Sequence, residues 1–194
     1  MRPKMIYLVG APATGKSSVM KEIHRQLGVY TDDKWFKIWP TTHDEFRGEL
    51  LLDDLLGTPR GLSLGITREK FGGTDAIGMA SSSEAMAWIQ ETIEIPKLIL
   101  GEGSRLTIGK FFAACAQRVD LTIGHLHANQ QTLDNRCEVR GSTQTATFRK
   151  AGATRAANAA KAAEMAGAKV IECSTHYLQP DSIAYQIIRF AGIK

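Results

Sequence analysis

The sequence has few of the features that mark membrane, secreted or disulfide-bonded proteins. No apolar run in its 194 residues reaches the ~18 residues needed to span a bilayer, so we expect no membrane partner. The chain has 3 cysteines and no CxxC pair, which argues against a disulfide framework or a zinc site. The apolar part of the N-terminal segment is too short for a signal peptide. We therefore expect a cytoplasmic protein with reduced thiols.

The positive charge of the chain is concentrated in one region. The net charge is +4, and residues 136–169 contain seven basic residues but only two acidic ones. Such a stretch attracts the phosphates of a nucleotide or a nucleic acid, although a solvated helix face can have the same composition. With 43% hydrophobic residues and no repeat or linker, the chain is expected to form a single domain over residues 1–194.

Strand-like and helix-like segments alternate along the sequence. Residues 5–9 form a short apolar run, and residues 16–27 carry apolar side chains at helical spacing before Gly28. Residues 49–56 are compatible with a short helix, and SSSE at 81–84 is typical of a helix cap. Further strands are expected at 35–39, 97–100, 119–128 and 168–173, and further helices at 81–94, 110–117, 130–140, 154–166 and 180–191. This alternation predicts a three-layer α/β fold, with a five-stranded parallel sheet covered by helices on both faces.

The most specific motif is GAPATGKS at residues 10–17, which matches GxxxxGK[ST] at every fixed position. In such a loop, backbone N–H groups and the start of the following helix bind phosphates. Lys16 can reach the β- and γ-phosphates, and the Ser17 hydroxyl can bind Mg²⁺. The motif lies between a predicted strand and a predicted helix, as this chemistry requires. It predicts that ATP and Mg²⁺ bind through Gly10, Ala13, Thr14, Gly15, Lys16, Ser17 and Ser18.

Other segments favour a kinase among the proteins that use this loop. The guanine-reading [NT]KxD motif of GTPases is absent from the sequence, and motor ATPases are usually larger. Glu102 directly follows an apolar strand, where it can orient an attacking hydroxyl, accept its proton or hold Mg²⁺ through water. Arg105 can then bind a phosphate of the acceptor. A solvated turn with an ordinary acid is the alternative interpretation of these two residues.

Arginines in the basic stretch are candidates for the other side of the site. Arg136 and Arg140 lie one helical turn apart before a polar loop, and Arg149 and Arg155 follow that loop. Arginines that close over a migrating phosphoryl group stabilise its charge and exclude water. We therefore expect a mobile lid over residues 134–156, with Arg136 and Arg140 on the nucleotide and Arg149 and Arg155 on the reacting phosphates. Each arginine taken alone is equally compatible with a surface charge.

The acceptor is expected to bind within residues 41–95, an insertion that is rich in glycine. Glycines at 72 and 73 allow the backbone to approach a ligand closely. Phe71 can stack on a base, and Asp75 can form a hydrogen bond with a base edge or a hydroxyl group. A glycine-rich connector with a capping aspartate is the structural alternative.

The order of these motifs is similar to that of nucleotide kinases. It looks most like the small bacteriophage-type P-loop kinases that are labelled thymidylate-kinase-like, on four motifs: GxxxxGKS, EGSR at 102–105, LHA at 126–128 before an arginine-rich helix, and GGTDA at 72–76. Some members of that group phosphorylate free deoxynucleoside monophosphates, and others phosphorylate 5-hydroxymethyluracil in phage DNA, a step of thymine hypermodification. The chain lacks the Asp-Arg-Tyr-type motif of cellular thymidylate kinases, which argues against free dTMP as the acceptor.

Two classes of function follow from the sequence. The first is an ATP- and Mg²⁺-dependent kinase acting on a pyrimidine nucleotide, either free or within DNA, and the basic C-terminal third favours DNA. The second is a DNA-binding accessory protein that hydrolyses ATP without an acceptor. Transfer of a labelled γ-phosphate to an acceptor distinguishes them. The sequence makes no prediction about the oligomeric state.

Overall fold

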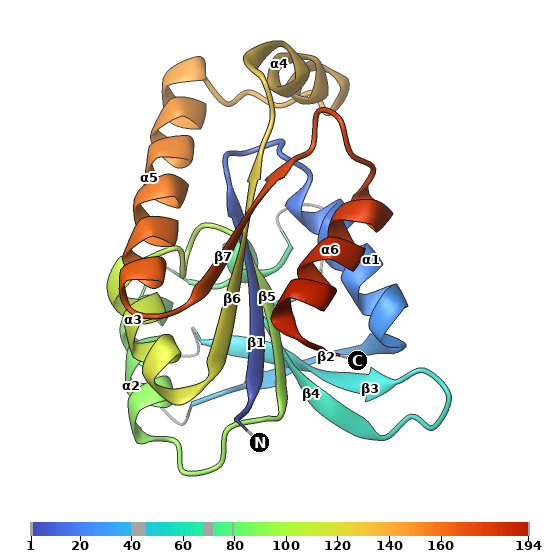
Figure 1. Ribbon diagram of the computed structural model, residues 1–194, viewed down its shortest axis with the longest axis vertical. Helices are drawn as coiled ribbons and strands as arrows, with labels where there is room; N and C mark the ends of the chain where they lie inside the picture. The colour runs from blue at the N-terminus through green and yellow to red at the C-terminus, as the bar shows by residue number, and fades with distance from the viewer. Residues whose placement is uncertain (1, 40–45, 68–71, 79, 194) are drawn as a thin grey trace.

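The computed structural model describes residues 2–39, 46–67, 72–78 and 80–193 (Figure 1). The strands are β1 (Lys4–Gly10), β2 (Val29–Lys37), β3 (Arg47–Asp53), β4 (Pro59–Leu64), β5 (Leu98–Glu102), β6 (Asp120–His127) and β7 (Lys169–Ser174). The helices are α1 (Lys16–Leu27), α2 (Ser81–Glu91), α3 (Gly109–Arg118), α4 (Gln130–Val139), α5 (Ala146–Met165) and α6 (Pro180–Ala191), with a 3₁₀-helix η1 (Thr74–Ala76).

Within the described residues, the strands form one sheet in the order β2-β3-β4-β5-β1-β6-β7. Strands β4, β5, β1, β6 and β7 run parallel to each other, and β3 is antiparallel to both β2 and β4. The parallel strands therefore end at one edge of the sheet, where β1 lies between β5 and β6. In open α/β sheets this carboxyl edge is where ligands bind.

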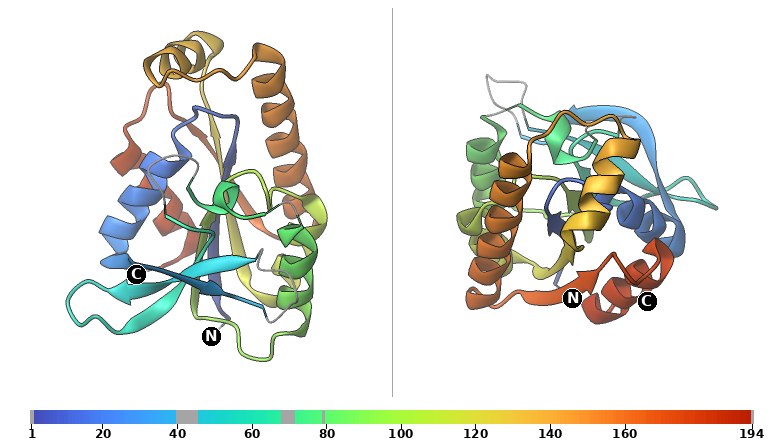
Figure 2. Two further views of the ribbon diagram at one scale, coloured as in Figure 1. Left: turned by 180° about the vertical axis from the view of Figure 1, so that it is seen from behind. Right: turned by 90° about the horizontal axis from the view of Figure 1, so that it is seen from above.

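Helices cover both faces of the sheet (Figures 1 and 2). Helices α1 and α6 pack together on one face, α2, α3 and α5 cover the other, and α4 lies beyond the carboxyl edge. Alternate residues of β1 point into the two cores: Ile6 and Leu8 face α1 and α6, and Met5, Tyr7 and Val9 face the other helices. Among the described residues, no helix has the length and apolar character needed to cross a bilayer.

The predicted class of fold is confirmed, and the sheet is larger than expected. Five strands are parallel, as predicted, but one of the five is β4, which was not predicted. Residues 35–37 of the predicted strand at 35–39 instead form the end of the edge strand β2, which pairs antiparallel with β3. The predicted helix at 49–56 is wrong, because residues 47–53 form β3. Leu51 packs beneath α1 while Leu50 and Leu52 face the opposite side, so three adjacent leucines hide the alternation that marks a strand.

Two helix starts also differ from the prediction. Helix α5 begins at Ala146, eight residues earlier than expected, because the Thr145 side chain accepts a hydrogen bond from the Phe148 N–H (3.2 Å). The expected lid segment therefore consists of the end of α4, a short connection and the first turns of α5. At α2 the expected cap is absent, since Ser81 donates to the Gly78 carbonyl and the Glu84 carboxylate accepts from the Phe46 N–H.

Candidate active site

The phosphate-binding loop connects β1 to α1 at the carboxyl edge of the sheet. Gly10 has no room for a side chain, because a Cβ atom there would lie 2.4 Å from the Leu126 carbonyl oxygen of β6. Ala13 and Gly15 have φ angles of 65° and 86°, which turn the chain from strand to helix. Thr14 is buried and donates to the Ala11 carbonyl (2.8 Å), so its hydroxyl stabilises the loop from inside. The backbone therefore holds the curved shape that a phosphate nest requires.

Lys16 and Ser17 begin α1 directly after this loop, and Ser18 is exposed in the same turn. The Lys16 ammonium donates to the carbonyl oxygens of Gly10 (3.1 Å) and Ala11 (3.0 Å). Burial lowers the pKa of Lys16, while Glu102 and Asp75 act on it in the opposite direction. The ammonium group therefore lies over the phosphate loop and near two carboxylates.

Glu102 is the last residue of β5 and lies beside β1, where it pairs in register with Leu8. Its side chain is buried, at 7% exposure, and burial raises the pKa of its carboxyl group. A hydrogen bond with Ser17 and the positive charge of Lys16 lower that pKa in part. Glu102 is thus a buried acid that contacts the predicted Mg²⁺-binding hydroxyl.

Asp75 reaches the same place from a different segment. Residues 72–76, which include η1, lie against the carboxyl end of β5, because a Cβ atom on Gly73 would lie 2.7 Å from the Glu102 carbonyl oxygen. On the facing side, a Cβ atom on Gly103 would lie 3.2 Å from the Asp75 carboxyl carbon. Asp75 accepts hydrogen bonds from the Ser104 N–H (2.6 Å) and hydroxyl (2.7 Å). The glycines therefore let the segment that carries Asp75 lie against the end of β5, where the charges of Asp75 and Glu102 act on each other. Phe71 lies outside the described residues.

A buried tyrosine, which was not predicted from the sequence as a site residue, holds the segment of Asp75 against the end of β5. The Tyr7 hydroxyl lies 2.8 Å from the Thr74 hydroxyl and donates to the Gly103 carbonyl (3.1 Å). Thr107 donates to the same carbonyl (2.6 Å). Burial raises the pKa of Tyr7, so its hydroxyl keeps its proton. The signal in the sequence was a tyrosine in an otherwise aliphatic strand that leads into the phosphate loop.

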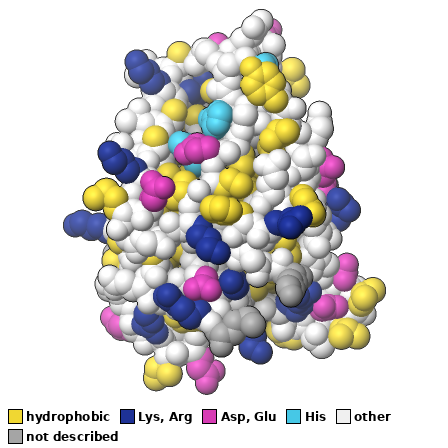
Figure 3. Space-filling view, viewed as in Figure 1, with side chains coloured by type: hydrophobic (Ala, Val, Ile, Leu, Met, Phe, Trp, Pro, Cys, Tyr) yellow, Lys and Arg dark blue, Asp and Glu magenta, His cyan; other side chains and the backbone are white. Residues whose placement is uncertain are grey.

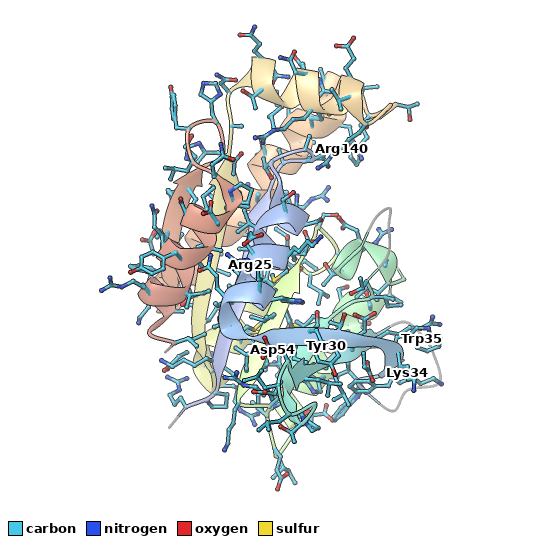
Figure 4. The ribbon with its side chains drawn as sticks, turned by 90° about the vertical axis from the view of Figure 1, so that its right-hand side faces the viewer. Arg25, Tyr30, Lys34, Trp35, Asp54 and Arg140 are labelled. Atoms are coloured by element: carbon cyan, nitrogen blue, oxygen red, sulfur yellow. The ribbon has the colours of Figure 1, made fainter. Side chains whose placement is uncertain are left out.

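Two of the four candidate arginines lie next to the phosphate loop. Arg136 donates to the Ala13 carbonyl (3.3 Å) and to the carbonyl (2.8 Å) and hydroxyl (3.0 Å) of Thr175, which follows β7. It therefore links α4, the loop and the end of β7. Arg140 is exposed between α4 and the start of α1 (Figure 4), and its charge acts on both Lys16 and Glu102.

The other expected arginines lie elsewhere. Arg149 forms an ion pair with Asp134 and donates to the Gln144 carbonyl (2.6 Å), so it joins α5 to α4. Arg155 lies in an open groove between α3 and α5, and Arg105 is partly buried in the turn after β5. Lysine and arginine side chains are dispersed among acidic ones on the face of α5, β7 and α6 seen in Figure 3, so this face has no continuous basic patch. The roles predicted for these arginines and for a lid at 134–156 stay predictions.

The arrangement suits ATP and Mg²⁺. Gly10 lets the loop pack closely against β6, Ala13 and Gly15 turn its backbone, and the Lys16 ammonium group lies beside it. The Ser17 hydroxyl, hydrogen-bonded to the buried Glu102 carboxylate, is a hard oxygen donor of the kind that Mg²⁺ prefers. Such sites complete the magnesium shell with phosphate oxygens and water, so they need few protein ligands.

A parallel α/β sheet with this loop, an acid at the end of the neighbouring strand and arginines beside the loop defines a P-loop kinase, a phosphotransferase. A family model described as P-loop Nucleotide Kinase3 matches residues 1–189, and the chain belongs to this family. No curated protein sequence matches the chain.

Solved structures of other kinases are similar to the chain. One is shikimate kinase from Acinetobacter baumannii in complex with shikimate, with 15% identity, a TM-score of 0.49, and coverage of 96% of this chain and 92% of that chain. Another is an unliganded sugar kinase from Janibacter, with 10% identity, a TM-score of 0.47, and coverage of 98% and 95%.

Proposed function

We propose that the protein transfers the γ-phosphoryl group of ATP to a hydroxyl group on a pyrimidine nucleotide, and that this acceptor is 5-hydroxymethyluracil within DNA. The observation that carries the proposal is that two carboxylates, Glu102 and Asp75, lie near enough to Lys16 for their charges to act on it, with Glu102 also hydrogen-bonded to Ser17. In this proposal Lys16 and the loop hold the phosphates, and Ser17 holds Mg²⁺, with Glu102 behind it. Magnesium would neutralise charge on the phosphate oxygens.

The carboxylate pair supports a hydroxyl acceptor over a phosphate acceptor. A hydroxyl group must lose its proton during transfer, and Asp75 is a carboxylate at the carboxyl edge of the sheet that can accept this proton. A nucleoside monophosphate offers an oxygen that is already ionised, so it needs no base and is repelled by two acids. The hydroxymethyl group of 5-hydroxymethyluracil is such a hydroxyl, and the GGTDA segment is similar to that of the phage-type kinases, a group that includes both kinases of this base and kinases of free nucleotides.

The proposed step balances as a single displacement. The acceptor oxygen forms a bond to the γ-phosphorus, and the bond from that phosphorus to the bridging oxygen of ADP breaks. The hydroxyl proton passes to the Asp75 carboxylate, and Lys16 compensates charge on the phosphates. Arg140, exposed at the end of α4, is the residue best placed to cover the migrating group.

A panel of acceptors tests the proposal. The protein is incubated with γ-labelled ATP and Mg²⁺, and with oligonucleotides that carry either thymine or 5-hydroxymethyluracil at one position. Free dTMP, dCMP and dGMP are tested in parallel. We expect label on the 5-hydroxymethyluracil oligonucleotide and none on its thymine counterpart, which lacks only the hydroxyl.

The other outcomes identify the competing functions. Label on a free monophosphate alone would identify a deoxynucleoside monophosphate kinase, the second candidate, which the family description favours. Label in inorganic phosphate alone, with every acceptor, would identify an ATP-hydrolysing accessory protein. Either result would overturn the proposed acceptor.

A further inference from the structure

An aromatic residue and an arginine stack on each other at the edge of the sheet, away from the phosphate loop. Trp35, near the end of β2, is 48% exposed, and the guanidinium carbon of Arg47 lies 4.0 Å from the centre of its ring. Trp35 lies opposite Glu49 in the β2–β3 pairing, and Arg47 is two residues from Glu49, so all three side chains lie on one face of the ribbon. The stack is a cation–π contact on a partly exposed surface.

This stack is tied to the segment that carries Asp75. Strand β2 runs parallel to β4, so Trp35 lies toward the carboxyl edge of the sheet, the edge of the active site. The Arg47 carbonyl accepts from the Gly65 N–H (2.9 Å), and the next residue, Ile66, forms an antiparallel bridge with Gly73, two residues before Asp75. The buried Glu49 carboxylate accepts from the N–H (2.8 Å) and hydroxyl (2.6 Å) of Thr67. A ligand that reaches Asp75 and extends along the edge of the sheet would therefore meet Trp35.

We infer, on the basis of the proposed function, that Trp35, Arg47 and the exposed Lys37, which pairs with Arg47 on the same face, form a platform for single-stranded DNA that flanks the acceptor base. The chemistry fits because an exposed indole stacks on any base, and nearby cations pair with the phosphates. Stacking on Trp35 also holds the Arg47 guanidinium in place, so less conformational freedom is lost when it binds an anion. Figure 4 shows Lys34 and Trp35 at the end of β2, on the side of the molecule that also presents Arg140.

The charges at the platform favour DNA over a second copy of the chain. Strand β2 is an edge strand, and edge strands can pair with another molecule. A symmetric antiparallel pairing centred between Trp35 and Phe36 would place Lys34 opposite Lys37 of the other copy. Like charges directly opposite each other destabilise such a pair, whereas Lys37 and Arg47 on the Trp35 face complement a phosphate backbone.

The test measures DNA binding without ATP, so it does not depend on catalysis. The full chain is titrated against a fluorescently labelled, single-stranded oligothymidylate, and binding is followed by anisotropy. We expect Trp35→Ala to raise Kd by about 5- to 150-fold and Trp35→Phe to restore most of the affinity. Lys37→Ala should reduce the slope of log Kd against log salt by about 0.7.

Tyr30→Ala is the matched control. Tyr30 is an exposed aromatic of the same strand, but it lies opposite Leu52, on the other face of the ribbon. We expect this variant to bind DNA like the unaltered chain. Melting temperatures of all variants, by differential scanning fluorimetry, verify that each one folds.

Three results would overturn the platform: no DNA binding by the unaltered chain, equal Kd for Trp35→Ala, or an equal loss in Tyr30→Ala. Loss of a dimer in Trp35→Ala with unchanged DNA affinity would instead identify a second copy as the partner. The proposed function fails separately, when no label reaches 5-hydroxymethyluracil in an oligonucleotide that the protein binds.

Discussion

Removing one buried hydroxyl group tests how the active site is positioned. In Tyr7→Phe the ring keeps its place in the core, where it packs edge-on against Phe112 at 5.0 Å between ring centres. Only the phenolic oxygen is lost, and with it the contacts to Thr74 and to the Gly103 carbonyl. Gly103 keeps a second donor in Thr107, but the hydroxyl of the fully buried Thr74 loses the partner that the structure gives it. The substitution therefore acts mainly on η1, which carries Asp75.

The size of the effect follows from these contacts. Leaving a buried hydroxyl without a partner costs about 1–3 kcal/mol, or roughly 2–10 °C in Tm for a chain of this size. If Thr74 moves to find another partner, Asp75 moves with it, and a displacement of about 1 Å at a reacting group can cost ~100-fold in rate. We expect kcat to fall by about 10- to 100-fold while KM for ATP changes by less than about threefold, since the phosphate loop is untouched.

Steady-state kinetics of phosphoryl transfer and thermal unfolding measure the two effects together. Ile187→Val in α6 is the control, because it removes a fully buried methyl group that packs against Gly124 and costs about 0.5–1.5 kcal/mol without contacting the site. Its kcat should be unchanged. Thr74→Val should resemble Tyr7→Phe, and the double variant should be little worse than either single one. A Tyr7→Phe enzyme with a lower Tm but normal kcat would refute the positioning role.

Three further predictions concern the phosphate side of the site. Lys16→Ala should abolish transfer in the labelling assay while circular dichroism shows a folded chain, and near-normal transfer would contradict the assignment of the loop. Because burial raises the pKa of Glu102 above its ordinary 4.5, ionisation of this carboxyl destabilises the fold as pH rises past that value. Glu102→Gln should therefore raise Tm at pH 8 and leave it nearly unchanged below pH 4, and it should lower kcat at least tenfold. An equal gain in Tm at both pH values would show that ionisation of this carboxyl group is not the cause. Arg136→Ala should raise KM for ATP about tenfold. Arg136→Lys should reverse only part of that increase, because one ammonium group cannot replace a guanidinium group that contacts both Ala13 and Thr175. An unchanged KM would show that these contacts do not support ATP binding.

The local parts of the fold were predictable from the sequence, and the long-range parts were not. The phosphate loop and α1 are specified by residues that are adjacent in the sequence, so a single motif was enough to predict both. Strand β4 begins at Pro59 and contains Gly61, residues that weaken a strand pattern, and it forms only because β3 and β5 pair with it on either side. The predicted helix at 49–56 was wrong for a related reason: leucines on both faces of β3, buried at Leu51 and partly buried at Leu50 and Leu52, removed the alternation of apolar and polar residues that marks a strand.

In the candidate site, too, the residues specified by local sequence were predictable, and those that depend on long-range contacts were not. Lys16 and Ser17 could be named from the motif, and Glu102 from its place after a strand. That Asp75 lies beside them depends on close backbone contacts at Gly73 and Gly103, and sequence spacing carries no information about such contacts. Tyr7 was missed because its role depends on Thr74, 67 residues away in the chain. The roles of the arginines were the hardest to predict, because a long flexible side chain can bind a ligand, a backbone carbonyl or water equally well.

The most direct test of the central claim compares two oligonucleotides that differ by one hydroxyl group. Each is incubated with the protein, ATP and Mg²⁺, and intact-mass spectrometry follows the oligonucleotide. We expect the added mass of one phosphoryl group on the 5-hydroxymethyluracil strand, no added mass on the thymine strand, and loss of the addition in Asp75→Asn. Unmodified strands together with phosphorylated free monophosphates, or with ADP and inorganic phosphate alone, would contradict it.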